Sequence, residues 1–107
     1  MNSRSIALIA CSKDRWALAG DQLFVDFDLS VANLPVDSLV KIGEATIVIT
    51  ANPHLGCAKF QRRFGEDAME FVNSPCGREL RLRGVNAKSV EGGRVRVGDA
   101  ISKIDRR

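Results

Sequence analysis

The chain has 107 residues, of which 45% are hydrophobic and 27% are charged, and this composition indicates one globular domain and excludes disordered and fibrous proteins. No apolar run approaches the roughly 20 residues that a membrane-spanning helix needs, and no signal-peptide pattern accompanies the apolar residues near the start. Three widely spaced cysteines do not form the framework of a disulfide-rich secreted protein. We therefore expect a single domain over residues 1–107, without a membrane partner, in the cytoplasm and with reduced thiols.

The first 30 residues predict two short strands around one short helix. The apolar run at residues 5–10 favours a short buried strand. Ser12 and Gly20 are typical residues for the beginning and the end of a short helix. Residues 23–29 place an apolar side chain at every second position, which predicts a half-buried strand.

The middle of the chain contains the clearest patterns. Residues 40–42 and 45–49 alternate in hydrophobicity on either side of Gly43, which predicts a β-hairpin. A run of apolar residues at helical spacing then begins at Phe64, with acidic residues in the first turn that complement the helix dipole. This helix must end before Pro75.

Two later segments alternate apolar residues with arginines. Residues 80–83 and 94–97 have this pattern, which predicts two strands whose arginines face water or a ligand. Many short strands with glycine turns and two or three short helices favour a mainly antiparallel sheet, either open or curled into a barrel.

Charge is unevenly distributed along the chain. Residues 1–56 have four cations and six acidic residues, a net charge of −2, whereas residues 57–107 have twelve cations and seven acidic residues, a net charge of +5. The basic half can attract an anion such as a phosphate-bearing cofactor, or it is an ordinary solvated surface. Nucleic acid is a disfavoured partner, because one tryptophan, no tyrosine and no recognition motif accompany this charge.

Cys57 is the main candidate for chemistry. It follows a β-branched run and precedes Lys59, Arg62 and Arg63. Only the thiolate is a nucleophile or metal ligand, and neighbouring cations lower the pKa of a thiol, so we expect Cys57 to be reactive. The alternative is a small buried hydrophobic residue. His54, the only histidine, either orients this thiol or satisfies local hydrogen bonds in a turn.

The second half also resembles a known family through an ordered set of short motifs. They are Asn52-Pro53-His54, Cys57-Ala58-Lys59-Phe60, Arg63-Phe64-Gly65, Phe71-Val72-Asn73, Gly77-Arg78, Leu80-Arg81-Leu82-Arg83-Gly84, Val90-Glu91-Gly92-Gly93 and Val97-Gly98-Asp99-Ala100-Ile101. This set resembles the later part of the MOSC domain, the C-terminal domain of molybdenum cofactor sulfurases, and residues 5–40 are more loosely similar to it. MOSC domains normally begin with a further glycine-rich segment, so the resemblance implies a truncated or minimal member.

The resemblance implies a fold, a function and a site. The implied fold is a mainly β, MOSC-like antiparallel β-barrel, complete or incomplete, with two or three short helices. The implied function belongs to the molybdenum cofactor and sulfur-handling class, with Cys57 as a sulfur carrier that forms a persulfide or as a molybdenum ligand. If the chain is an enzyme, its chemistry is then sulfur transfer or depends on the molybdenum cofactor. The cofactor, molybdopterin, would be held through its phosphate by cations of the basic half, namely Lys59, Arg62, Arg63, Arg81 and Arg83.

An alternative function is a non-catalytic binding or assembly module derived from a MOSC domain. The partners implied by the first function are a sulfur donor or a molybdoenzyme. A shortened barrel would leave a strand edge without a partner, and such an edge is a template for another chain. We therefore expect a homo-oligomer, with a dimer as the simplest form.

Overall fold

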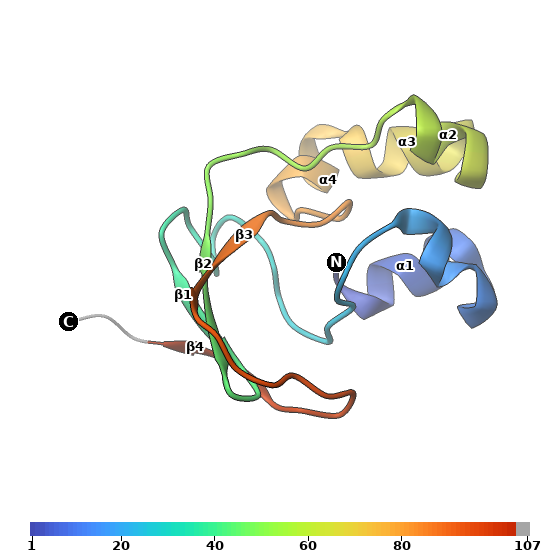
Figure 1. The fold of residues 1–107 in the computed structure, drawn as a ribbon. Coiled ribbons are helices and arrows are strands. Elements are labelled where there is room, and N and C mark those ends of the chain that lie inside the picture. The colour runs from blue at the N-terminus through green and yellow to red at the C-terminus, as the bar shows by residue number, and fades with distance from the viewer. Residues whose placement is uncertain (105–107) are drawn as a thin grey trace.

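An open, four-stranded antiparallel sheet forms one side of the molecule (Figure 1). The computed structural model describes residues 1–104. The strands are β1 (Leu39–Ile42), β2 (Ala45–Ile49), β3 (Ala87–Glu91) and β4 (Ile101–Ile104), in the order β3-β2-β1-β4. Each neighbouring pair is antiparallel, so β3 and β4 are the two outer strands.

The predicted hairpin is confirmed as β1 and β2. Ile42 pairs with Ala45 across a two-residue turn, and Gly43 has a φ of 55° there, a conformation that favours glycine. Val40 and Ile42 are buried while Lys41 between them is exposed, so the alternation turns one face of the sheet towards the core.

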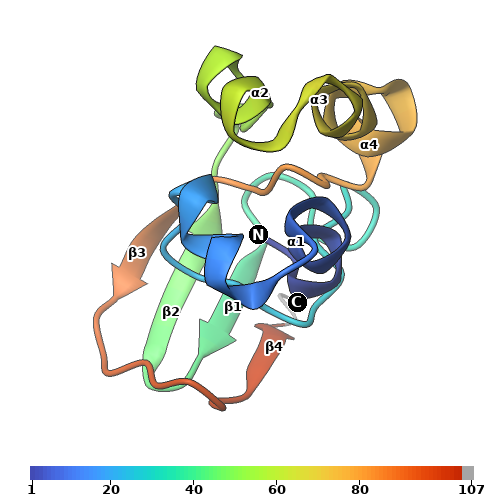
Figure 2. The same ribbon diagram turned by 90° about the vertical axis from the view of Figure 1, so that its right-hand side faces the viewer.

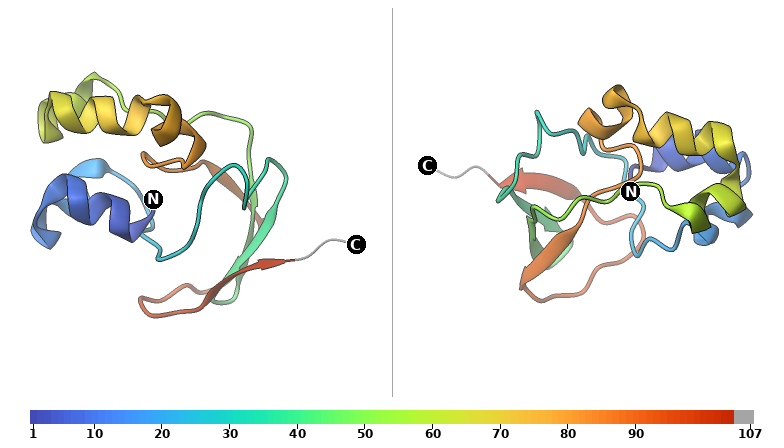
Figure 3. Two further views of the ribbon diagram at one scale, coloured as in Figure 1. Left: turned by 180° about the vertical axis from the view of Figure 1, so that it is seen from behind. Right: turned by 90° about the horizontal axis from the view of Figure 1, so that it is seen from above.

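Five helical segments lie on one side of the sheet in two groups (Figures 1 and 2). The first group is α1 (Ser3–Ala10) with the 3₁₀ helix η1 (Lys13–Ala19). The second group is α2 (Ala58–Phe64), α3 (Glu66–Asn73) and α4 (Pro75–Glu79). In the view from behind, the second group lies above the first (Figure 3).

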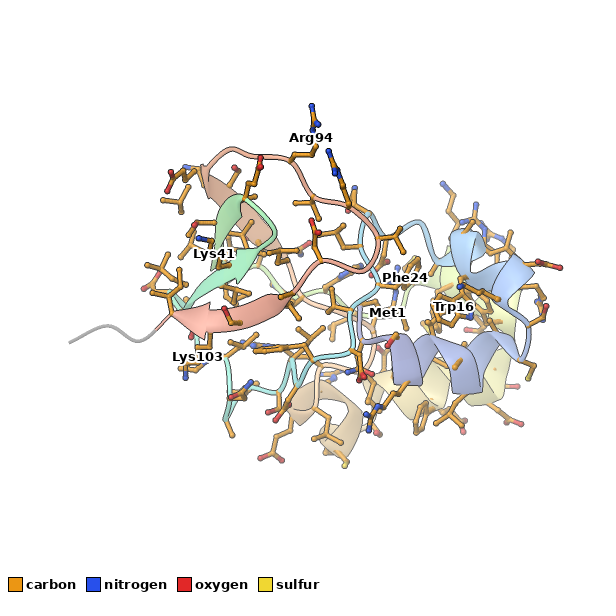
Figure 4. All side chains as sticks on the ribbon, turned by 90° about the horizontal axis from the view of Figure 1, so that it is seen from below. Met1, Trp16, Phe24, Lys41, Arg94 and Lys103 are labelled. Atoms are coloured by element: carbon orange, nitrogen blue, oxygen red, sulfur yellow. The ribbon has the colours of Figure 1, made fainter. Side chains whose placement is uncertain are left out.

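Two hydrophobic clusters hold these parts together. One lies against the sheet and contains Val40, Ile42 and Ile49, together with Leu29 and Leu34 from the segment between η1 and β1. The other lies among the first helices, and its buried members are Met1, Ile6, Ala10 and Ala19. Beside the second cluster the Trp16 and Phe24 rings are 5.4 Å apart, and both are labelled next to Met1 in Figure 4.

The helix between Ser12 and Gly20 is confirmed in position, and it is a 3₁₀ helix. The helix expected before Pro75 is confirmed as α3, although it begins at Glu66 and is preceded by the separate helix α2. Gly65 separates the two helices with a φ of 96°, which is why the helical pattern does not run on unbroken from Phe64.

The strand expected at residues 5–10 is wrong, because this segment is α1. The Asn2 side chain accepts hydrogen bonds from the backbone N–H groups of Arg4 (2.9 Å) and Ser5 (3.2 Å), which caps a helix. Ile6 and Ala10, four residues apart, are both fully buried on one face of it. A short apolar run is ambiguous between strand and helix, and here the cap decides.

Three other expected strands are also wrong. Residues 23–29 make only an isolated bridge between Asn2 and Val25. Residues 80–83 form turns after α4, where Arg81 has a φ of 51° that no strand residue adopts. Residues 94–97 lie in the loop between β3 and β4.

The mainly β barrel is therefore contradicted. The described chain is a mixed α/β fold with an open sheet, because residues 23–29, 80–83 and 94–97 do not supply the strands that closure would need. The antiparallel character of the sheet was predicted correctly, whereas its extent was not.

Candidate functional site: an exposed thiol and a basic cavity

Cys57 lies at the start of α2. Its backbone is extended, with φ −118° and ψ 178°, and the helix begins at the next residue. Its side chain is exposed, so the alternative of a small buried hydrophobic residue does not apply. Cys11 and Cys76 are exposed as well, and all three cysteines are free.

The pKa of the Cys57 thiol is lowered from its ordinary value. The backbone N–H groups of Phe60 and Lys59 make the largest contributions, and the charge of Arg83 makes a smaller one. Among the described residues, the Cys57 sulfur accepts no hydrogen bond that caps α2. The N–H groups of Lys59 and Phe60 therefore act as nearby dipoles that favour the thiolate. The pKa shift has the direction expected from the sequence, but it comes from backbone N–H groups and the charge of Arg83, and not from the side chains of Lys59, Arg62 and Arg63.

The three cations that follow Cys57 in the sequence lie in different surroundings. Lys59 and Arg62 are exposed on α2. Arg63 donates a hydrogen bond of 2.8 Å to the carbonyl of Leu18, and its own carbonyl accepts one of 2.8 Å from Arg15. Arg63 therefore joins α2 to η1 instead of standing free beside the thiol.

Arg83 is part of a buried charge cluster. Its guanidinium group forms an ion pair of 2.7 Å with Asp21 and donates a hydrogen bond of 2.9 Å to the carbonyl of Ala19. It also lies over the Phe60 ring, with its Cζ atom 5.0 Å from the ring centroid. The Met1 amino group lies 3.4 Å from the other Asp21 oxygen. Burial lowers the pKa of that amino group, and Asp21 opposes the effect.

Arg81 is held by backbone oxygens. It is half-buried, and its guanidinium group donates hydrogen bonds to the carbonyls of Leu29 (3.2 Å) and Leu34. Burial lowers the pKa of Arg81. No carboxylate within residues 1–104 forms an ion pair with this guanidinium group.

A cavity of about 240 Å³, which we call the basic cavity, adjoins both arginines. Its walls include Arg78, Arg81 and Arg83 with His54 and Val85, and in the described part of the chain they include no Asp or Glu. Cys57, Lys59, Arg62 and Arg63 are not among its walls. The structure thus brings two of the five predicted cofactor-binding cations to one cavity, without the thiol.

His54 lines this cavity and makes no hydrogen bond to Cys57 within the described residues. Burial, and then the charge of Arg83, lower the pKa of His54, and Asp21 opposes the shift. Its Nδ1 atom is buried without a hydrogen-bond partner in residues 1–104. His54 therefore belongs to the cavity and to the Asp21–Arg83 cluster, and not to a Cys–His pair.

The residues present do not fit a molybdopterin phosphate as one site. Such a site needs several cations around one space. Lys59 and Arg62 are exposed on α2, and Arg63 is joined to η1, so these three cations lie away from the cavity that Arg81 and Arg83 share, and the thiol lies outside it as well. Across residues 1–104, no group of three or more His, Cys, Asp or Glu side chains could hold a metal ion.

The sequence did not reveal two parts of this site. Asp21 is 62 residues from Arg83, and no spacing rule connects them. The N–H groups of α2 were missed because the helix was expected to begin at Phe64, although Cys57 followed by Ala58 and Lys59 could have marked an earlier beginning.

In the described range, no helix is both long enough and apolar enough to cross a membrane. No family model, no curated protein and no solved structure matches the chain. Inferences about its function therefore come from its own residues and geometry.

Proposed function

We propose that this chain is a sulfur-handling module of the MOSC-like class, in which Cys57 carries sulfur as a persulfide. The observation that carries the proposal is the exposed Cys57 thiol, whose pKa is lowered by the backbone N–H groups of α2. The ordered motifs of the second half support the same class through their resemblance to the domain of molybdenum cofactor sulfurases.

The proposed step is thiol–persulfide exchange. The Cys57 thiolate attacks the outer sulfur of a donor persulfide, the donor S–S bond breaks, and the donor leaves as a thiolate. A new S–S bond forms on Cys57, so one sulfur atom moves and no net oxidation occurs. The reverse exchange passes that sulfur to an acceptor thiolate. Exposure of Cys57 gives both partners access to it.

The test uses glutathione persulfide as donor and intact-protein mass spectrometry as readout. We expect the chain to gain the mass of one sulfur atom on Cys57 and to lose it when an acceptor thiol is added. The Cys57→Ser variant should gain nothing, whereas Cys11→Ser and Cys76→Ser should behave like the unmodified chain, since those exposed thiols are the matched controls. A gain of one sulfur atom by Cys57→Ser would overturn the proposal.

The role of Cys57 as a molybdenum ligand remains a separate proposal, and the motif resemblance alone supports it. Its test is direct: the protein is purified from its native host and examined for molybdenum by elemental analysis and for a pterin by fluorescence. Retention of both, lost in Cys57→Ser, would favour this role over sulfur carriage. We propose a cytoplasmic setting for either role, because the three free thiols are exposed, as is usual in a reducing compartment.

The open sheet favours a second candidate, an assembly module that forms a homodimer. β3 is exposed along its whole length, and within the described residues its outer edge has no strand partner. Such an edge can pair with a second copy of the chain. Light scattering across a dilution series should show a dimer that dissociates. A monomer at every concentration would refute this assembly and leave the proposal for Cys57 intact.

A further inference from the structure

A second cavity, which we call the apolar cavity, lies between the core face of the sheet and the segment that follows η1. Its volume is about 330 Å³. Aliphatic side chains from the sheet and from the connecting segments make most of its walls; among them are Leu29, Leu34, Ile47, Ile49, Val85 and Ile101. Residues 21–34, blue to cyan in Figure 1, run between the helices and the sheet and supply part of this wall.

The shape and lining of this cavity suit a small ligand. It is partly open to solvent, so a ligand can enter it and displace water from its apolar walls. Ligand sites in proteins begin at about this volume and are mostly apolar with a few placed polar groups.

The polar groups lie at one end of the apolar cavity. Asp21 and His54 are in its walls, and His54 and Val85 are also walls of the basic cavity, so the two cavities adjoin there. Asp21 is already bound by Arg83 and by the Met1 amino group. Asp21 Oδ2 and His54 Nδ1 each lie 3.0 Å from the position that a Cβ on Gly84 would occupy, and His54 Nδ1 has no partner within residues 1–104.

The net charge around this junction is positive, because the Asp21 carboxylate there is already shared by Arg83 and the Met1 amino group. Arg81 donates to the carbonyls of Leu29 and Leu34, whose side chains line the apolar cavity, and no described carboxylate pairs with it. Arg78 and Arg83 face the basic cavity with it, and among residues 1–104 only Arg83 has an acidic partner. Both recorded hydrogen bonds of Arg81 come from Nη1, so its half-buried guanidinium group keeps other donors and a positive charge that favour an anion close by.

We infer that the two cavities form one binding site for a small aliphatic carboxylate. The hydrocarbon tail fills the apolar cavity, and the carboxylate lies at His54 and Val85, where Arg81 supplies the opposite charge. This site goes beyond the sulfur chemistry proposed for Cys57, which lines neither cavity. A purely apolar ligand would leave Arg81 unpaired, and a small inorganic anion would leave the apolar cavity empty.

The test compares four probes on the unmodified chain of residues 1–107 by titration calorimetry. They are octanoate, octanol, acetate and inorganic phosphate. Octanol has the tail without the charge, whereas acetate and phosphate have charge without the tail. We expect octanoate to bind at least about ten-fold more tightly than each of the others, because a hydrogen bond to a charged group and a buried tail each contribute about that factor. Octanol, acetate or phosphate binding as tightly as octanoate would overturn the inference, as would the absence of octanoate binding.

Two variants with matched controls locate the site. Ile47→Phe narrows the apolar cavity and should weaken octanoate binding at least about ten-fold, whereas Val90→Phe on exposed β3 should not. Arg81→Gln should abolish the preference for octanoate over octanol, whereas Arg62→Gln, an equal change of charge at an exposed position, should retain it. Equal effects of a variant and its control would overturn the inference. If a variant does not fold, the four probes on the unmodified chain still decide.

Discussion

Replacement of Arg83 by Ala should strongly destabilise the fold. Arg83 and Asp21 form a buried pair at 2.7 Å, and their side chains are only 9% and 7% exposed. Removal of one partner of a buried ion pair typically destabilises by about 3–5 kcal/mol, because the other charge stays buried and poorly compensated. Arg83→Ala also loses the hydrogen bond to Ala19 and the contact with the Phe60 ring.

This loss is large for a chain of this size. At about 0.05–0.15 kcal/mol per residue, the expected free energy of unfolding is about 5–16 kcal/mol. In urea denaturation, a loss of about 4 kcal/mol at an m-value of about 2 kcal/mol per M lowers the midpoint by about 2 M. Arg62→Ala, at an exposed position, is the control and should change the free energy of unfolding by less than about 0.5 kcal/mol. A loss below about 1 kcal/mol for Arg83→Ala would refute the structural role of the Asp21–Arg83 pair.

Three further predictions concern the stability of the fold. Burial and Arg83 lower the pKa of His54 below its ordinary 6.5, so the unfolded chain binds the proton more readily. The free energy of unfolding should therefore fall as the pH decreases below 6.5, and His54→Gln should make this decrease smaller. Urea denaturation at several pH values measures it. The same pH dependence in His54→Gln as in the unmodified chain would contradict the prediction. Gly77→Ala should destabilise by about 1–3 kcal/mol, because its Cβ would collide with two carbonyl oxygens of α3, whereas Gly92→Ala has open space and should be neutral in thermal melts. Asn2→Ala should lower the free energy of unfolding by about 1 kcal/mol or more in thermal melts, because it removes the α1 cap and a hydrogen bond of 2.6 Å to a backbone carbonyl. An unchanged melting temperature would show that the cap is dispensable.

The sequence predicted those elements whose signal is local. The β1–β2 hairpin has alternating residues around Gly43, and α3 has its acidic first turn and a proline after its end. α1 was mistaken for a strand because its apolar run is too short for periodicity to decide, and the deciding contact is the Asn2 side chain.

Non-local interactions account for the larger errors. Arg81 and Arg83 alternate with leucines as strand residues do, yet both side chains turn inward to carbonyls or to Asp21, and the backbone forms turns. A pattern of hydrophobicity cannot show that a distant carboxylate or carbonyl will bind an arginine. The cations that follow Cys57 in the sequence predicted a reactive thiol. The backbone N–H groups that lower its pKa belong to the first turn of α2, whose beginning was not predicted.

Competitive alkylation of the three cysteines tests the central claim, a reactive thiolate at Cys57, most directly. The folded chain is treated with limiting iodoacetamide over a series of pH values, and the modified peptides are quantified by mass spectrometry. All three side chains are exposed, so access does not separate them, and differences in rate reflect the thiolate. At neutral pH we expect Cys57 to be alkylated faster than Cys11 and Cys76. This difference in rate should disappear when the chain is unfolded in urea. Modification of Cys11 or Cys76 at an equal or higher rate in the folded chain would contradict a reactive thiol at Cys57.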